Sequence, residues 1–112
     1  MFITSIRLDN FELEIIEEKR PVLLACLHRY FEFREQTDVL KMVSKEYAES
    51  LKVCVLSEDF SRFFSEKFGI EGSPIFLIFN DGEEINRLLG KVDRERLIAF
   101  LSQTLLCSKG GK

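Results

Sequence analysis

Hydrophobic positions divide the chain into short apolar runs separated by amphipathic stretches. Residues 21–27 read Pro-Val-Leu-Leu-Ala-Cys-Leu, and residues 75–79 read Ile-Phe-Leu-Ile-Phe. Runs of this length without a polar face are typical of central strands in a sheet that helices cover on both sides. Residues 3–8 and 51–56 show shorter strand patterns. The sequence therefore predicts four strands before residue 80.

Helical spacing of apolar residues predicts helices between and after these strands. The buried stripes consist of Val39, Leu40, Val43 and Tyr47 in residues 34–49, Phe60, Phe64 and Phe68 in residues 59–68, and Leu97, Phe100, Leu101, Thr104 and Leu105 in the closing helix. A short helix over about residues 9–18 is expected to begin at Asp9, with Glu12 three residues later as in a capping box. Asp93 is the predicted N-cap of the closing helix.

Turn residues complete the order of elements. Asp81-Gly82 lies between two strand-like runs, which is a strong signal for a hairpin and hence for antiparallel final strands. Pro74 is expected to open one strand, and Gly90 to end the next. The order is β-α-β-α-β-α-β-β-α, which predicts an α/β domain with a mixed central sheet and helices on both faces.

The segment around this hairpin resembles thioredoxin. Residues 67–74 read Lys-Phe-Gly-Ile-Glu-Gly-Ser-Pro, followed by the apolar strand and by Asn-Asp-Gly-Glu at residues 80–83. Thioredoxins carry a similar K-Y-G-I-R-G-I-P stretch before a buried strand and a tight turn. The resemblance extends over about residues 3–105 and needs no gap from residue 51 to 101. It implies a thioredoxin-like fold, with a domain over residues 1–107 and a flexible tail over residues 108–112.

The resemblance also shows which chemistry this chain lacks. The C-G-P-C redox motif of the family falls on residues 30–33 or 31–34, which contain no cysteine. That motif needs a thiolate at a helix amino terminus and a second thiol that resolves the mixed disulfide. The buried aspartate of the family falls on Leu24 or Ala25, and its lysine on Val55. These losses predict a redox-inactive domain that is more plausibly not an enzyme.

The predicted role is therefore that of a module that binds a protein or an extended peptide, as a chaperone-like or adaptor domain. In the family, the proline that matches Pro74 follows a cis peptide bond. The residue before that proline contacts an extended substrate. Aromatic residues replace the redox motif, and aromatic side chains are enriched at interfaces. The expected binding surface consists of Tyr30, Phe31, Glu32, Phe33, Ser73, Pro74 and Gly90.

An enzymatic alternative stays open. It is an atypical thiol–disulfide oxidoreductase that uses a single cysteine, Cys26 or Cys107. Cys26 and Cys54 lie in apolar strands, where inert core thiols are the simpler interpretation, although a redox pair between neighbouring strands is possible. His28 lies near the lost redox motif without a nucleophile at triad-like spacing. A homodimer through the aromatic loop or a sheet edge is a third possibility.

Composition limits the remaining classes of function. The chain has 112 residues, a net charge of −3 and a pI of about 5.3, which gives no sign of nucleic-acid or membrane binding. Three widely spaced cysteines form neither a disulfide framework nor a zinc pattern, so no metal and no cofactor are expected. Free thiols fit a reducing compartment, and the amino terminus lacks a signal-peptide pattern, so the expected location is the cytoplasm.

Overall fold

The predicted α/β architecture is confirmed in a computed structural model of the chain. The structure describes residues 3–27, 33–47, 49–56, 58–69 and 74–110, with only the backbone described for residues 58–61 and 106–110. Its elements are β1 (Ile3–Ile6), η1 (Glu12–Ile16), β2 (Val22–Cys26), α1 (Phe33–Glu46), β3 (Lys52–Leu56), α2 (Glu58–Phe68), β4 (Ile75–Asn80), β5 (Glu83–Leu89) and α3 (Arg94–Gly110). Their order agrees with the predicted one.

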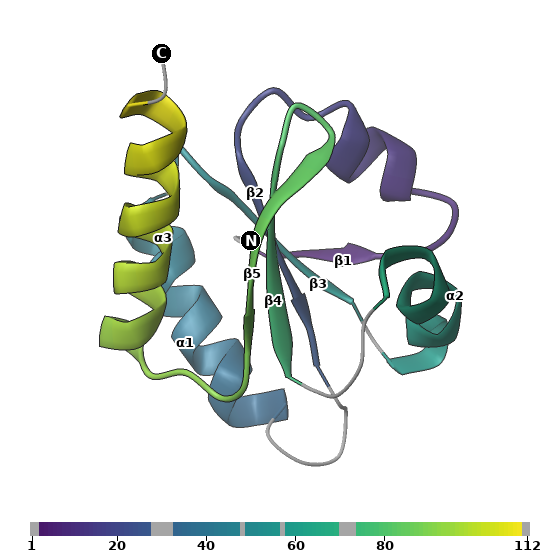
Figure 1. Cartoon of the computed structure of the whole chain (residues 1–112). Helices are drawn as coiled ribbons and strands as arrows, with labels where there is room; N and C mark the ends of the chain where they lie inside the picture. The colour runs from purple at the N-terminus through teal and green to yellow at the C-terminus, as the bar shows by residue number, and fades with distance from the viewer. Residues whose placement is uncertain (1–2, 28–32, 48, 57, 70–73, 111–112) are drawn as a thin grey trace.

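The five strands form one mixed sheet in the order β1-β3-β2-β4-β5. Strands β1, β3 and β2 are parallel, whereas β4 runs antiparallel to both β2 and β5. Helices α1 and α3 cover one face, and η1 and α2 cover the other (Figure 1). Every residue of β2 is buried, which is why its sequence is apolar on both faces.

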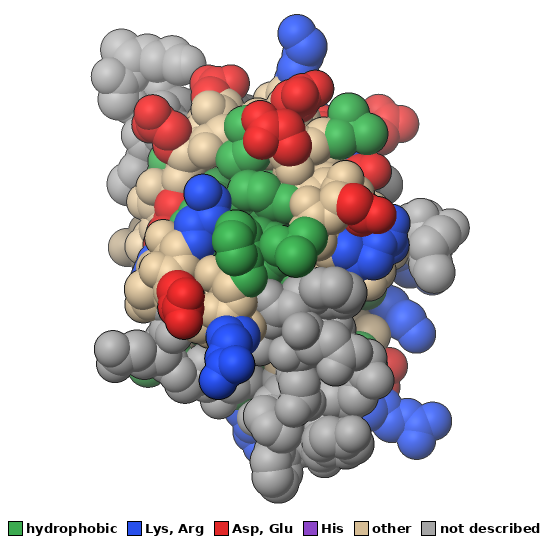
Figure 2. Space-filling model, turned by 90° about the vertical axis from the view of Figure 1, so that its right-hand side faces the viewer, with side chains coloured by type: hydrophobic (Ala, Val, Ile, Leu, Met, Phe, Trp, Pro, Cys, Tyr) green, Lys and Arg blue, Asp and Glu red, His purple; other side chains and the backbone are tan. Residues whose placement is uncertain are grey.

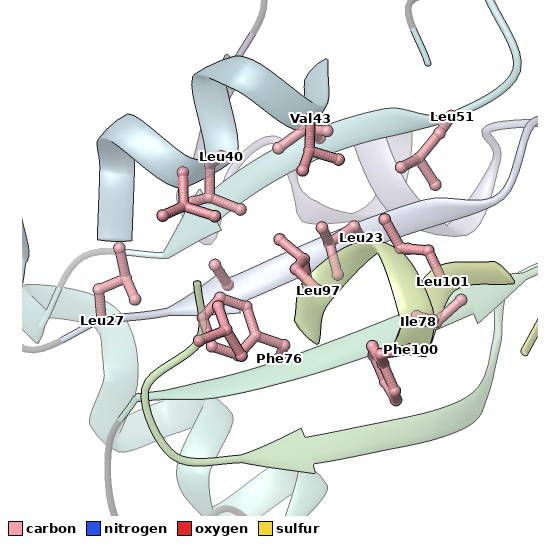
Figure 3. Close-up of a cluster of buried hydrophobic side chains, with 14 residues drawn as sticks. Leu23, Leu27, Leu40, Val43, Leu51, Phe76, Ile78, Leu97, Phe100 and Leu101 are labelled. Atoms are coloured by element: carbon pink, nitrogen blue, oxygen red, sulfur yellow. The ribbon is translucent and has the colours of Figure 1, made fainter. Parts of the chain in front are cut away.

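Alternating residues of the sheet divide the core into two clusters. Leu23, Ala25 and Leu27 face the cluster that α1 and α3 cover, together with Leu40 and Leu97. Figure 3 shows this cluster, in which side chains from both helices converge on β2 and β4. The other cluster consists of Ile6, Phe11, Ile15, Val22, Leu24, Cys26, Cys54, Leu56, Phe64, Ile75, Leu77 and Phe79. Cys26 and Cys54 therefore both lie under η1 and α2.

Two predicted turn features are present. Asp81 and Gly82 have φ angles of 54° and 80°, as the left-handed residues of a tight hairpin between β4 and β5 require. A Cβ atom on Gly82 would also lie 3.1 Å from the carbonyl oxygen of Ile16. Asp93 is the N-cap of α3, because its Oδ1 accepts a 2.8 Å hydrogen bond from the amide of Arg96.

The predicted capping box at Asp9 and Glu12 is wrong. The first helical turn follows Phe11, and no side chain caps it. Asp9 instead pairs with Arg7 at 3.1 Å. Asn10 closes the turn after β1, since its Oδ1 accepts from the amide of Arg7 at 2.6 Å. The short η1 element thus follows a turn that the Asn10 side chain closes. This turn occupies the position where the helix cap was expected.

The carboxyl-terminal helix is longer than expected. α3 continues to Gly110, so residues 108–110 belong to its backbone rather than to the predicted tail. Among the described residues, no helix is long and apolar enough to cross a membrane.

Candidate functional site

The candidate site lies where β2 ends and β4 begins. Cys26 is the last residue of β2, and its register partner on β4 is Ile75. Ile75 is in turn paired with Leu89 on β5, so the three residues form one row across the sheet. Leu89 is 59% exposed, whereas Cys26 is only 5% exposed. The row therefore runs from a buried thiol to an apolar side chain at the sheet edge.

Pro74 and Gly90 extend this end of the sheet by one step. The carbonyl oxygen of Pro74, a buried residue, accepts a 2.9 Å hydrogen bond from the amide of Gly90. Gly90 has a φ of +108°, a conformation that residues with a Cβ rarely adopt. Glycine is thus required where the chain leaves β5 toward α3.

Burial raises the pKa of the Cys26 thiol to about 12. The main cause is loss of solvation of the thiolate, and the charge of Glu84 acts in the same direction. The positive charge of Arg87 opposes this shift. At neutral pH, Cys26 is therefore a protonated thiol with one cation near it.

The Arg87 guanidinium links β5 to the end of α2. It forms two hydrogen bonds with Glu84, at 2.5 and 2.7 Å. Its Nη2 and Nη1 atoms also donate to the carbonyl oxygens of Phe68 and Gly69, at 2.8 and 3.3 Å. These carbonyls lack helical partners because α2 ends there. Arg87 thus caps α2 and provides the cation that acts on Cys26.

Cys54 does not pair with Cys26. Both are free thiols, and burial also raises the pKa of Cys54 to about 12. The register pairs Cys54 with Leu24, and Cys26 with Leu56, so the two cysteines are offset by two residues on adjacent strands. The strand spacing and rise place their Cα atoms about 8 Å apart. A disulfide requires less than about 7 Å, so the possible redox pair is wrong.

A buried glutamine joins the start of α1 to the connection between β5 and α3. The Gln36 side chain is 1% exposed. Its Nε2 donates to the carbonyl oxygen of Val92, and its Oε1 accepts from the amide of Val92, both at 2.9 Å. Sequence reasoning missed this residue. The available signal was a polar residue four positions before Leu40, on the buried stripe of the helix.

The structure describes part of the predicted binding surface. His28, Tyr30, Phe31, Glu32 and Ser73 lie outside the described residues. Phe33 is half-buried and packs against the core cluster beneath α1 and α3. Pro74 and Gly90 meet through their backbone hydrogen bond. Of the expected surface, the described residues thus bring together Pro74 and Gly90.

Cys107 lies far along α3 from this site. The helix begins at Arg94, beyond the end of β5, and runs toward the opposite end of the sheet (Figure 1). Thirteen residues of helix separate Arg94 from Cys107, a rise of about 20 Å. The side chain of Cys107 is outside the described residues. Cys26 is therefore the cysteine whose backbone belongs to the candidate site.

The described residues provide no acid–base group beside Cys26 on its own strand. Leu24 and Ala25 are fully buried at the position of the family's aspartate, and Val55 packs against the core at the position of its lysine. Among the residues that the structure describes, no group of three His, Cys, Asp or Glu side chains could hold a metal ion.

Exposed apolar side chains also occur away from the candidate site. Figure 2 shows a hydrophobic patch on the side where η1 and α2 lie, with charged side chains around it. Leu13 on η1 is 64% exposed, and Phe63 on α2 is 50% exposed. The helical periodicity assigned Phe64 and Phe68 to the buried face of α2, and Phe63 lies outside that stripe. No function was predicted for these two residues.

Comparison with curated proteins finds several relatives of similar length. The chain is 28% identical to a thioredoxin from Pseudomonas aeruginosa over 97 residues, which are 86% of this chain and 90% of the relative. It is 26% identical to thioredoxin C-2 from Corynebacterium nephridii over 98 residues, 87% and 91% of the two chains. A thioredoxin from Porphyra purpurea is 25% identical over 104 residues, 92% and 97% of the two chains.

These relatives correct the functional interpretation. The prediction of a redox-inactive module that acts by binding proteins is wrong, because the relatives are all named thioredoxin. The chemistry implied by that resemblance is thiol–disulfide exchange. The comparison therefore favours the oxidoreductase alternative, and it does not support the expectation that the chain is not an enzyme. The sequence still contains no pair of cysteines at C-x-x-C spacing.

The assignment to a family rests on a match over most of the chain. The thioredoxin family model matches residues 2–103, which include all five strands and both ends of the candidate site. The strand order, the hairpin and the Pro74–Gly90 contact all lie within this match. The chain belongs to the thioredoxin family.

Proposed function

We propose that this protein catalyses thiol–disulfide exchange on polypeptide disulfides through a single thiol, that of Cys26. The observation that carries the proposal is the position of Cys26 at the end of β2, in register with the residue that follows Pro74. Family membership supports the reaction class. The position of Cys26 supports the choice of thiol, since Cys54 is fully buried in mid-strand and Cys107 lies far along α3.

The exchange needs one co-reactant, a low-molecular-weight thiol. The Cys26 thiol loses its proton to solvent, because β2 carries no carboxylate to accept it. Its thiolate attacks one sulfur of the substrate disulfide, forming a mixed disulfide and releasing the other sulfur as a thiolate, which takes up a proton. The small thiol then attacks the substrate sulfur of the mixed disulfide and regenerates Cys26. The net reaction exchanges one disulfide for another without net oxidation of the protein.

Burial makes Cys26 a slow nucleophile until the site opens. Only 5% of the residue is exposed, so a substrate sulfur reaches it only after local displacement of neighbouring chain. The Arg87 guanidinium then stabilises the thiolate, since its charge already opposes the rise in the pKa of Cys26.

The sheet edge beside Cys26 suits a polypeptide substrate. Leu89 presents an apolar side chain in the same row as Cys26. Pro74 and Gly90 border that row and would contact the substrate backbone in an extended form. We propose a reducing compartment, the cytoplasm, as the setting of the reaction, since the described cysteines are free thiols.

The test compares two serine variants within the same core cluster. The substrate is a synthetic peptide dimer joined by one disulfide, with glutathione as the small thiol. We expect Cys26→Ser to abolish peptide release and to prevent formation of the protein–peptide mixed disulfide. Cys54→Ser is the matched control, because Cys54 has the same raised pKa and lies on the adjacent strand. It should retain at least half of the wild-type rate.

Two outcomes would contradict the proposal. Loss of activity in Cys107→Ser with full activity in Cys26→Ser would move the reaction to the far end of α3. A wild-type rate no greater than that of glutathione alone would remove thiol–disulfide exchange as the function.

A further inference from the structure

We propose that Gln36 is a positioning residue that holds the Pro74–Gly90 edge at a set distance from the start of α1. The inference rests on the proposed function in one respect, namely that this edge receives the polypeptide substrate. The hydrogen bonds of Gln36 do not involve Cys26. The effect of Gln36 on the Pro74–Gly90 edge is transmitted through Val92 and Gly90.

The first link is the amide pair between Gln36 and Val92. Both polar atoms of the Gln36 side chain are used, one as a donor and one as an acceptor, and both bonds are 2.9 Å long. A side-chain amide that satisfies both backbone groups of one residue imitates the pairing of two strands. Val92 is itself 5% exposed and packs in the cluster beneath α1 and α3. The pairing therefore fixes the position of the chain after β5 relative to α1.

The second link joins this connection to the substrate edge. Gly90 is two residues before Val92, and its amide donates to the carbonyl oxygen of Pro74 at 2.9 Å. The φ of +108° at Gly90 turns the chain between these two contacts. A shift of Val92 relative to α1 would therefore be passed to Gly90 within two residues, and from Gly90 to Pro74.

Burial explains why this contact acts as a rigid link. Gln36 is 56 positions from Val92 in sequence and is 1% exposed, so water does not compete for its hydrogen bonds. A polar side chain in a core is costly unless all of its groups are paired. An apolar residue at position 36 would leave the buried amide and carbonyl groups of Val92 without this partner. The amide thus provides directional positioning that hydrophobic packing alone does not supply.

The experiment uses Gln36→Met, which keeps the length of the side chain and removes both hydrogen bonds. The matched control is Thr104→Val. It removes another side-chain hydrogen bond, the partly buried 2.8 Å bond that Asn86 donates to Thr104, which joins β5 to α3 and does not involve residues 90–92. Amide hydrogen exchange is measured residue by residue in the wild type and in both variants.

We expect Gln36→Met to increase the exchange rates of the Val92 and Gly90 amides at least tenfold, relative to amides of β2. Thr104→Val should leave both amides within threefold of wild type. An unchanged Gly90 amide in Gln36→Met would overturn the inference, because the shift would then stop at Val92. This measurement decides the positioning role even if the protein has no exchange activity.

A kinetic comparison separates positioning from general loss of stability. We expect Gln36→Met to raise KM for the peptide disulfide at least fivefold, with kcat within twofold of wild type. The rate with a small neutral disulfide, hydroxyethyl disulfide, should be unchanged because such a molecule does not use the edge. An equal loss with both substrates would contradict a positioning role.

A second variant keeps the inference testable if Gln36→Met does not fold. Gln36→Glu retains both hydrogen bonds when its carboxyl is protonated, and it loses the donor to Val92 when ionised. We expect the protection of the Gly90 amide to match wild type at low pH and to fall at least tenfold as the new carboxyl ionises. Protection that does not change with pH would overturn the inference.

Discussion

The reactivity of Cys26 provides the most direct test of the burial argument. The structure raises its pKa to about 12, whereas an ordinary cysteine has a pKa of about 8.5. At pH 7.5 the thiolate fraction is then about 3,000-fold lower than that of a free cysteine. Thiolates of higher pKa are stronger nucleophiles, and a Brønsted coefficient of about 0.45 recovers about 40-fold. The closed protein should therefore react on the order of 100-fold more slowly than a cysteine peptide.

The assay follows mixed-disulfide formation with hydroxyethyl disulfide by peptide-level mass spectrometry from pH 7 to 10. We expect the Cys26 rate to rise tenfold per pH unit over this range without a plateau, because the pKa lies above it. Cys54 is the internal control, with the same raised pKa and no exposed surface. It should show the same slope and a lower rate.

A plateau of the Cys26 rate below pH 9 would refute this reasoning. So would a rate at pH 7.5 within threefold of that of the peptide. Either result would mean that the positive charge of Arg87 outweighs the loss of solvation. Cys26 would then be a reactive thiolate in the closed protein.

Two further predictions concern the pH dependence of the free energy of unfolding. For Cys54, whose folded pKa is raised, the contribution to stability is complete below about pH 9 and is lost as pH rises toward 12. The destabilisation caused by Cys54→Ala should thus shrink by about 1.4 kcal/mol per pH unit above pH 9, measured by urea unfolding. A constant difference from pH 8 to 10.5 would contradict the assigned pKa. The pKa of Glu18 is lowered to about 2, chiefly by its hydrogen bond with Arg20, so its contribution is present above pH 4.5 and lost as pH falls through 2. Glu18→Gln should be less stable than wild type at pH 6, with the difference vanishing near pH 2, and an equal difference at both values would count against this ion pair.

The local features of the fold were predictable from short stretches of sequence. The apolar run over residues 21–27 contains the buried central strand β2 (Val22–Cys26), and Asp81-Gly82 forms the hairpin turn. Asp93 caps α3 as predicted. Each of these depends on residues within a few positions of one another, so the pattern carries the physical cause.

The same local reasoning failed at Asp9. Asp9 was the predicted cap, whereas the residue that closes the turn after β1 is its neighbour Asn10. The side-chain amide of Asn10 accepts a hydrogen bond from the Arg7 amide and donates one to the Ser5 carbonyl. An amide can donate and accept at once, whereas a carboxylate only accepts. The backbone around β1 presents one donor and one acceptor, so Asn10 can satisfy both groups and Asp9 cannot.

The sequence by itself determined the order of elements, the apolar faces and the absence of a C-x-x-C motif. The tertiary structure decided which thiol lies at the site, since strand register places Cys26 beside Ile75 and separates it from Cys54. It also decided the roles of Gln36 and Arg87, whose partners lie 56 and 18–19 positions away. Local patterns report conformational preferences of neighbouring residues. Contacts between distant residues depend on how the whole chain packs, and packing also sets the desolvation that raises the pKa of a buried thiol.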